Sequence, residues 1–176
     1  MKTNDAEVRQ LEPNDVEAFQ TLRREGLMSH PLSFGASVED EANLAHGSIV
    51  ASFDSPKRSA VFGGFLDRSL VGVVGVQRHG ARKASHRAYV WGMYVTPAAR
   101  GRGLGRSLLA AAVAHARSWP GLLQLQVTVT DVSPEARHLY ESFGFRTWGR
   151  EPRTLCWGDT FADEYHLVLM LDEVAG

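Results

Sequence analysis

The sequence predicts a mixed α/β sandwich built around one twisted sheet. Segments that favour strands and helices follow one another in the order β-α-α-β-β-β-α-β-α-β-β, which is typical of helices packed on a mixed sheet. The chain has 176 residues, of which 44% are hydrophobic, enough for one sizeable core. No repeat, linker or low-complexity tract divides it. We therefore expect a single domain over residues 1–176, with its core at about 6–172.

The first half of the chain offers a strand, a helix and a less regular segment. Residues 6–13 alternate in part and favour a first strand. Residues 16–27 favour a helix, with a cap at Asn14 or Asp15, because apolar residues recur there at helical spacing: Val16, Phe19, Leu22 and Leu27. The segment 30–54 begins with proline and glycine and carries an acidic cluster, so we expect a loop followed by one or two short helices.

The middle of the chain gives clearer signals. Two β-rich runs around the turn-compatible pair Asp67-Arg68 favour a hairpin over 59–79. An aromatic and β-branched run favours a strand over 86–95. After a glycine cluster, strong helix formers favour a helix over 104–119.

The last third repeats the alternation of strand and helix. An alternating strand over 122–130 leads to a helix over 134–143, for which Ser133 is the expected cap residue. A closing hairpin over 145–171 turns near residues 157–159.

Composition and charge narrow the class of protein. The formal net charge of −1 argues against a nucleic-acid partner, because proteins that bind nucleic acid usually carry a net basic surface. The single cysteine, Cys156, has no partner for an internal disulfide, which favours a reducing compartment. The N-terminal residues lack the apolar core of a signal peptide, and no apolar run approaches the ~18 residues of a membrane span. We expect a cytoplasmic protein with no nucleic-acid or membrane partner and no metal.

The stretch RGRGLG, residues 100–105, is a candidate anion site. A dinucleotide fingerprint would need a third glycine where Arg106 stands, and a P-loop would need a G-K-[ST] ending that does not follow. The pattern R-x-x-G-x-G between a strand ending at Val95 and a long helix does fit, since free N–H groups and the helix dipole converge there. The alternative is a solvated glycine–arginine turn.

Three segments resemble the GNAT-type N-acetyltransferase superfamily. MYVTPAARGRGLGRSLL, residues 93–109, resembles its strand, loop, [Q/R]-x-x-G-x-[G/A] motif and helix. LQVTVTDVSPEARHLYESFGF, residues 125–145, resembles its next strand and N-x-x-A-x-x-L-Y-x-x-x-G-F element, and DEYHLVLML, residues 163–171, its last strand. The resemblance implies the GNAT fold, with a mixed twisted central sheet of about seven strands and helices on both faces, and acetyl-CoA as the acetyl-donor cosubstrate.

The resemblance also implies roles for residues of the site. Tyr140 stands at the family's tyrosine and would be the general acid for the CoA thiolate, while the backbone N–H of Val95 would stabilise the oxyanion. Ser133 stands where many members have an asparagine that bonds the cofactor. The residues expected to bind acetyl-CoA are Met93, Tyr94, Val95, Arg100, Gly101, Arg102, Gly103, Leu104, Gly105, Arg106, Ser107, Ser133 and Tyr140.

The general base is not given by these motifs. Family members often place a glutamate on the strand before the glycine loop, and Tyr89 stands roughly at that position here. Glu41 is the tentative choice, with His79, Glu164 or a water chain as alternatives. Glu41 also fits a solvated acidic helix face, and His79 fits the end of an exposed strand. Three aromatic residues could line an acceptor pocket, although isolated aromatic residues more often pack in a core: Phe34, Trp91 and Trp157.

These signals lead to one expected function and two rivals. We expect transfer of an acetyl group from acetyl-CoA to a primary amine by direct attack, since no activated cysteine or serine is visible. The acceptor would be a small-molecule amine or a peptide or protein amine, and a homodimer is an expectation on family analogy alone. One rival is a non-catalytic acyl-CoA-binding or sensing module of the same fold. The other is a nucleotide-binding protein of a different fold.

Overall fold

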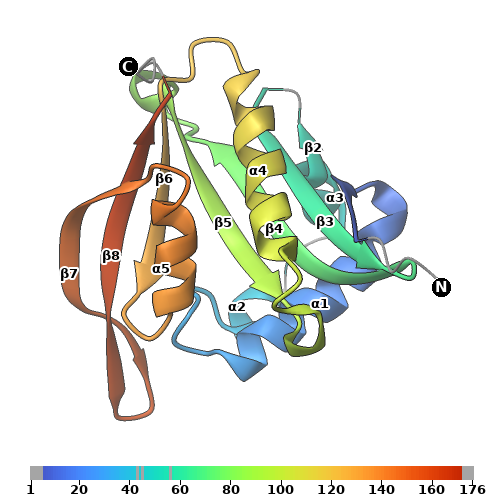
Figure 1. Cartoon of the computed structure of the whole chain (residues 1–176), viewed down its shortest axis with the longest axis horizontal. Coiled ribbons are helices and arrows are strands. Elements are labelled where there is room, and N and C mark those ends of the chain that lie inside the picture. Colours follow the sequence, from blue (N-terminus) through green and yellow to red (C-terminus); the bar gives the residue numbers. More distant parts are fainter. Residues whose placement is uncertain (1–5, 43, 45, 56, 172–176) are drawn as a thin grey trace.

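One mixed eight-stranded sheet organises the chain (Figure 1). A computed structural model describes residues 6–42, 44, 46–55 and 57–171. The sheet order is β1-β3-β4-β5-β6-β8-β7, with the short β2 paired to β3, and among these strands only β5 and β6 run parallel. The predicted mixed sheet is confirmed, and the two-residue β2 brings it to eight strands. The strands are β1 Glu7–Gln10, β2 Asp54–Ser55, β3 Ser59–Leu66, β4 Ser69–Arg78, β5 Arg87–Val95, β6 Gln124–Thr130, β7 Arg146–Trp157 and β8 Thr160–Met170.

Helices cover both faces of the sheet (Figure 1). Helices α1 (Val16–Ser29), α2 (Val38–Glu41) and α3 (His46–Phe53) lie on one face, and α4 (Leu104–Arg117) and α5 (Pro134–Glu141) lie on the other. Short 3-10 helices precede α1, β5 and α4, at Pro13–Asp15, Arg82–Ala84 and Pro97–Ala99. None of the helices that the structure describes is long and apolar enough to cross a membrane.

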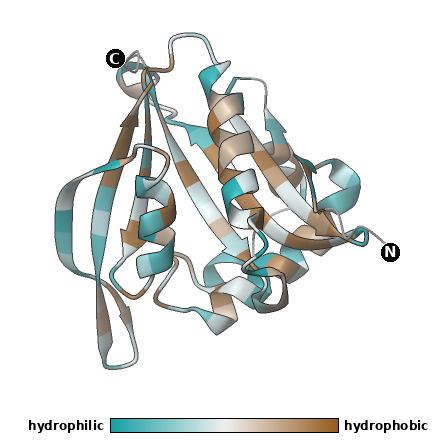
Figure 2. Cartoon of the chain, viewed as in Figure 1, coloured by the Kyte–Doolittle hydropathy of each residue, from teal (hydrophilic) through white to brown (hydrophobic). Residues whose placement is uncertain are grey.

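Alternating side chains of the central strands build a hydrophobic core on each face. Val61 and Val73 pack with residues of α1 and α3, whereas Val74 and Val76 pack against α4. Figure 2 shows hydrophobic residues concentrated on the central strands, while the outer strand β7 is largely hydrophilic. Period-2 alternation therefore divides the sheet between two helical layers, as the strand patterns predict.

The predicted turns form where left-handed backbone is needed. Asp67 and Arg68 join β3 to β4 with φ values of 46° and 67°, the conformation of a tight hairpin turn. The closing hairpin turns at Gly158, whose φ is 58°. Both hairpins stand where the sequence predicts them.

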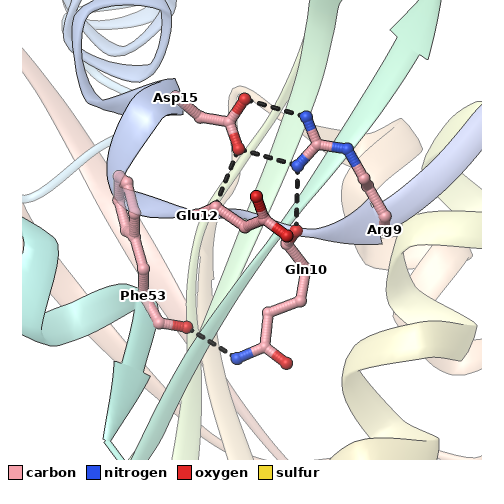
Figure 3. A network of polar contacts seen from close by, with 5 residues as sticks. All are labelled: Arg9, Gln10, Glu12, Asp15 and Phe53. Atoms are coloured by element: carbon pink, nitrogen blue, oxygen red, sulfur yellow. Dashed lines mark hydrogen bonds and ion pairs between the residues drawn. The ribbon is translucent and has the colours of Figure 1, made fainter.

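The start of α1 differs from the predicted cap (Figure 3). Asp15 is the cap residue by position, but its side chain makes no capping bond to the helix. Its carboxylate instead accepts two hydrogen bonds from Arg9, at 2.7 and 2.8 Å, and one from the Glu12 N–H. The bidentate pair joins two opposite charges through two hydrogen bonds, so the carboxylate links β1 to the start of α1. Strand β1 also ends at Gln10, earlier than expected, because Pro13 opens a 3-10 helix.

Candidate active site

A bulge in the middle of β5 marks the site. Between the pairs Val73↔Tyr94 and Gly75↔Trp91, β5 contains Gly92 and Met93 where β4 contains one residue. Gly92 has a φ of 66°, which side chains disfavour. The extra residue shifts the alternation: the Tyr94 side chain joins the core beneath α1, while Met93 packs toward α4.

Beside this bulge, β5 and β6 separate. The two strands pair only along Arg87–Tyr89 and Gln124–Gln126, while β6 remains paired to β8 along its whole length. The diverging strands are visible in Figure 1. A parallel pair that splits leaves unpaired main-chain groups facing a gap in the middle of a sheet, where a ligand can pair with them.

Val95 turns its N–H toward this gap. The Thr96 N–H donates to the Val71 carbonyl at 2.9 Å, and Val95 lies opposite Gly72. Because N–H groups of an antiparallel strand point alternately to its two edges, the Val95 N–H points away from β4. The Val95 carbonyl faces the same edge and accepts a hydrogen bond from Arg100 Nε at 2.9 Å. The N–H is therefore placed to donate to a group lying between the strands.

The loop after β5 forms a backbone cradle at the start of α4. Gly101 and Gly103 have φ values of 75° and 76°, and nothing lies within 4 Å of the position a Cβ would take on either. Gly103 is the cap residue of α4 and offers no side chain, so the first N–H groups of the helix are open to a ligand. Open space, free N–H groups and a helix N-terminus fit the pyrophosphate of acetyl-CoA.

The other predicted cofactor residues contribute differently. The Arg106 guanidinium donates to Ser142 at 3.1 Å and lies over the Phe143 ring, so its side chain is held against α5 and the turn that follows it. The Tyr94 hydroxyl donates to Glu25 at 2.8 Å on the opposite face, which leaves only its backbone near the gap. Leu104 is buried, and Ser107 is exposed on α4.

Ser133 stands at the start of α5 but makes no capping bond. Its hydroxyl is 2.8 Å from that of Ser33, on the loop after α1, 100 residues earlier in the chain. Ser133 is therefore the cap residue by position, as predicted, but its side chain bonds across the molecule rather than to the helix.

Tyr140 places its ring in the core beneath α5. The residue is only 4% exposed, and its ring meets that of Phe145 edge-on, with the ring centres 5.6 Å apart. Within the described residues its hydroxyl has no hydrogen-bond partner. Burial raises the pKa of Tyr140 well above its usual value near 10. Its phenol is therefore protonated at neutral pH and free to donate.

A cavity of about 500 Å³, which we call the splay cavity, opens where β5 and β6 part. Its walls include Val90 and Val127, whose side chains belong to the core beneath α4, and also Gln126 and Thr128 of the other face. The cavity is thus lined by residues from both of the strands that border the gap. Several predicted residues line it, and they come from four parts of the chain: Phe34, His79, Tyr89, Trp91 and Glu164. Trp157 lies instead at the far hairpin, 56% exposed.

A second cavity of about 620 Å³, which we call the apolar cavity, lies between α1, α2, α3 and the sheet. Arg23, Tyr89 and Trp91 line both cavities, so the two cavities meet at these side chains, which we call the shared wall. Glu41 lines the apolar cavity and holds Arg23 through contacts of 2.7 and 3.0 Å. The structure thus places the tentative base Glu41 in an ion pair at this wall.

Two residues of the site escaped the sequence reasoning. Arg23 falls on the apolar stripe of α1, four residues after Phe19 and four before Leu27, a spacing that could have revealed its burial. His166 lines the splay cavity, with Nε2 3.2 Å from Glu151. Tyr165 and Leu167 belong to the core on the face of α4 and α5, so alternation along β8 places His166 on the opposite face. This alternation was the signal in the sequence.

Comparisons with known proteins agree with this geometry. The model of the acetyltransferase (GNAT) family matches residues 20–145. Mycothiol acetyltransferase of Thermobispora bispora is 34% identical over 144 residues, which cover 80% of this chain and 46% of that protein, so the chain spans about half the length of that relative.

Solved structures share the fold. A GNAT-family acetyltransferase of Streptococcus pneumoniae has a TM-score of 0.82 at 22% identity, over 94% of this chain and 99% of its own. The yncA protein of Salmonella typhimurium, solved with its cofactor acetyl-CoA, has a TM-score of 0.83 at 19% identity, over 98% and 97% of the two chains. The splayed strands, the glycine cradle and the family match together show that the chain belongs to the GNAT family of acetyltransferases.

Proposed function

We propose that the protein is an N-acetyltransferase that moves an acetyl group from acetyl-CoA to a primary amine by direct attack. One observation carries this proposal. A cavity lined by residues of both β5 and β6 lies at the gap between these strands, and β5 leads on from there to the outward Val95 N–H and the glycine cradle. Such a gap lets a thioester and an amine approach each other from opposite faces of the sheet.

The donor would bind along β5 and the loop that follows it. The first N–H groups of α4, with Gly101 and Gly103, would hold the pyrophosphate, and the free edge of β5 would pair with the pantetheine arm. When bound, acetyl-CoA supplies the thioester carbonyl that the amine attacks. The other residues expected to bind acetyl-CoA stay predictions, among them Met93, Arg100, Arg102 and Ser133.

Two groups of this chain would assist the transfer. As the C–N bond forms and the C–S bond breaks, the Val95 N–H would donate to the carbonyl oxygen, which carries the developing negative charge. The Tyr140 hydroxyl would donate to the departing sulfur, so that CoA leaves as the thiol. The unpartnered hydroxyl of Tyr140 and the outward N–H of Val95 support these roles.

The amine must lose a proton, and the site offers three acceptors for it. Protonating Glu41 would cost its ion pair with Arg23, and Glu164 faces the cavity from β8. His79 lies where the β5–β6 pairing ends, with Nε2 3.1 Å from the Gln126 side-chain oxygen. That oxygen can only accept, so Nε2 donates to it, and in the neutral ring the lone pair then lies on Nδ1. We propose His79 as the base; the sequence-based choice of Glu41 stays a prediction.

Two measurements test the function. In a thermal-shift comparison we expect acetyl-CoA to raise the melting temperature, because a ligand at one hundred times its Kd stabilises the folded state by about 2.7 kcal/mol, while ATP and NAD do not. Thiol release from acetyl-CoA is then followed across a panel of amines. If acetyl-CoA binds but no amine provokes turnover, the protein is a non-catalytic acyl-CoA-binding module. Stabilisation by ATP or NAD alone would instead favour the nucleotide-binding rival.

The comparisons support acetyl transfer in general, whereas the acceptor of this protein is a proposal. Acetyl transfer is the activity named for the relative from Thermobispora bispora, but that protein is about twice as long as the matched region. We propose a small-molecule or peptide amine as the acceptor. A homodimer stays a prediction.

A further inference from the structure

Two buried polar atoms in the shared wall have no hydrogen-bond partner among the described residues. They are Nη1 of Arg23 and Nε1 of Trp91. The Arg23 side chain is only 9% exposed, and its Cζ lies 6.0 Å from the Trp91 ring. Buried donors without acceptors are rare and cost free energy. Two of them together, at the edge of a proposed substrate site, point to a ligand that supplies an oxygen.

The neighbours of Arg23 direct its unpaired nitrogen toward the bulge in β5. Glu41 takes Nε and Nη2, which leaves Nη1 as the free arm of the guanidinium. Nη1 is the nitrogen nearest Gly92, 3.4 Å from the position a Cβ would take there. The Phe34 ring covers the guanidinium, with its centre 5.0 Å from Cζ, so a ligand oxygen has to displace that ring to reach Nη1.

The charge at the wall sets the kind of oxygen that fits. Because Glu41 already balances the guanidinium, Nη1 can donate to a neutral carbonyl without leaving a buried charge unpaired. A carboxylate would add a negative charge, which Arg87 on the splay-cavity wall could offset. A neutral carbonyl group and a carboxylate thus present the same feature to Nη1, an oxygen atom close to the reacting amine.

The apolar cavity adjoins the splay cavity at the side chains that line both, Arg23 among them. Side chains from three helices give it a hydrophobic lining, among them Phe19, Leu27, Val38 and Ile49. Its volume of about 620 Å³ is within the range of small-ligand pockets. A substrate held by Arg23 with its amine in the splay cavity can therefore extend an apolar side chain into this space.

We propose that the acceptor is an α-amino carbonyl compound with an apolar side chain. Its amine lies in the splay cavity beside His79, its carbonyl oxygen accepts from Nη1 of Arg23 and Nε1 of Trp91, and its side chain fills the apolar cavity. This inference rests on the proposed function and names the substrate class of that site.

Four matched amines test it by thiol release: leucinamide, leucine, 3-methylbutylamine and glycinamide. We expect kcat/KM for leucinamide to exceed that for 3-methylbutylamine, which lacks the carbonyl, by about 10- to 100-fold. Leucinamide should exceed glycinamide, which lacks the side chain, by about tenfold or more. Leucine against leucinamide distinguishes a carboxylate from an amide as the oxygen source. Calorimetric titration of the same amines without acetyl-CoA should show the same order of affinity.

Variants separate recognition from structural support. Arg23→Lys keeps a cation for Glu41 but removes Nη1, so the leucinamide-to-methylbutylamine ratio of kcat/KM should fall about tenfold. Comparing this ratio between proteins at one pH cancels the different basicities of the two amines.

Trp91→Phe removes Nε1 and keeps a ring, and should also lower the leucinamide-to-methylbutylamine ratio. This variant tests the proposal even if the Arg23 variant folds poorly. Val38→Trp, which fills the apolar cavity, should lower only the leucinamide-to-glycinamide ratio. Arg82→Lys, on an exposed 3-10 helix, is the matched control.

The outcomes distinguish the two proposals. If no amine releases thiol, the proposed function fails. If amines react but 3-methylbutylamine equals leucinamide, or if Arg23→Lys lowers the rate with all four equally, the carbonyl assignment is overturned while the function stands. If glycinamide equals leucinamide, the assignment of the apolar cavity is wrong.

Discussion

Replacing Tyr140 by phenylalanine removes one hydroxyl from a buried ring and tests its role as the acid. Because that hydroxyl has no partner among the described residues, no hydrogen bond within the protein is lost, and we expect the free energy of unfolding at pH 7 to change by less than about 0.5 kcal/mol. The ring and its edge-on contact with Phe145 remain. If the hydroxyl donates to the departing sulfur, kcat should fall by about 10²- to 10⁴-fold.

The assay is steady-state thiol release with a good acceptor, alongside urea unfolding of the same preparation. Tyr165→Phe is the matched control, because Tyr165 lies on β8 and contacts Arg137 and Arg150 through its ring face. A Tyr140→Phe protein with unchanged kcat across the pH range would refute the acid role. A large loss of stability would show instead that the hydroxyl has a structural partner.

The same variant has a second effect at alkaline pH. Burial raises the pKa of Tyr140 in the folded state above the value near 10 expected in the unfolded chain. Its contribution to stability is therefore complete below pH 10 and is lost as pH rises toward the folded-state pKa, by up to about 1.4 kcal/mol per pH unit. We expect Tyr140→Phe to flatten the alkaline decline in unfolding free energy between pH 10 and 11. Some slope should remain, because burial also raises the pKa of Tyr89 and Tyr94.

Three further variants test the donor site, the N-terminal ion pair and the core. Gly103→Ala forces a side chain onto a φ of 76° and should cost about 1–2 kcal/mol of stability and raise KM for acetyl-CoA, as thermal unfolding and kinetics would show; an unchanged KM would count against the cradle. Asp15→Asn removes the pair with Arg9, whose hydrogen bonds lower the pKa of Asp15. This stabilisation, about 1 kcal/mol or less at a partly exposed site, is present above pH ~4 and lost as pH falls through the lowered pKa, so urea unfolding should separate the two proteins at pH 7 and less so at pH 3. Leu109→Ala empties a fully buried position of α4 and should cost about 2–5 kcal/mol; a cost below 1 kcal/mol would mean that α4 packs loosely.

The parts of the fold that local sequence determines were predictable. The Asp67-Arg68 turn, the start of α4 and the strand β5 depend on neighbouring residues, and each stands where its signal lies. Asp15 and Ser133 are cap residues by position, as predicted, but neither side chain bonds to its helix. A cap is a local bond of about 1 kcal/mol. The Asp15 carboxylate bonds instead to Arg9, six residues earlier, and the Ser133 hydroxyl to that of Ser33, 100 residues earlier.

The acceptor side of the site was less accessible to sequence reasoning. Arg23 and Glu41 are separated by 18 residues and meet only after α1 and α2 pack together. No local pattern in the sequence pairs these two residues, so Glu41 could not be distinguished from the two acidic residues beside it on the same short helix. His79 and Glu164 entered the list of candidate bases, but their shared cavity depends on how β4, β6 and β8 are ordered in the sheet.

The bulge at Gly92 connects the two halves of the site. Without the extra residue, alternation would place Trp91, Met93 and Val95 on one face of β5. With it, Trp91 remains on the face of α1, where it meets Arg23 and the two cavities, while Met93 and Val95 turn toward the face of α4. One residue in left-handed backbone thus lets a single strand present an acceptor wall on one face and a donor edge a few residues later. Because Arg23 Nη1 rests against this same glycine, the contacts proposed to hold the acceptor lie beside the turn that orients the donor strand.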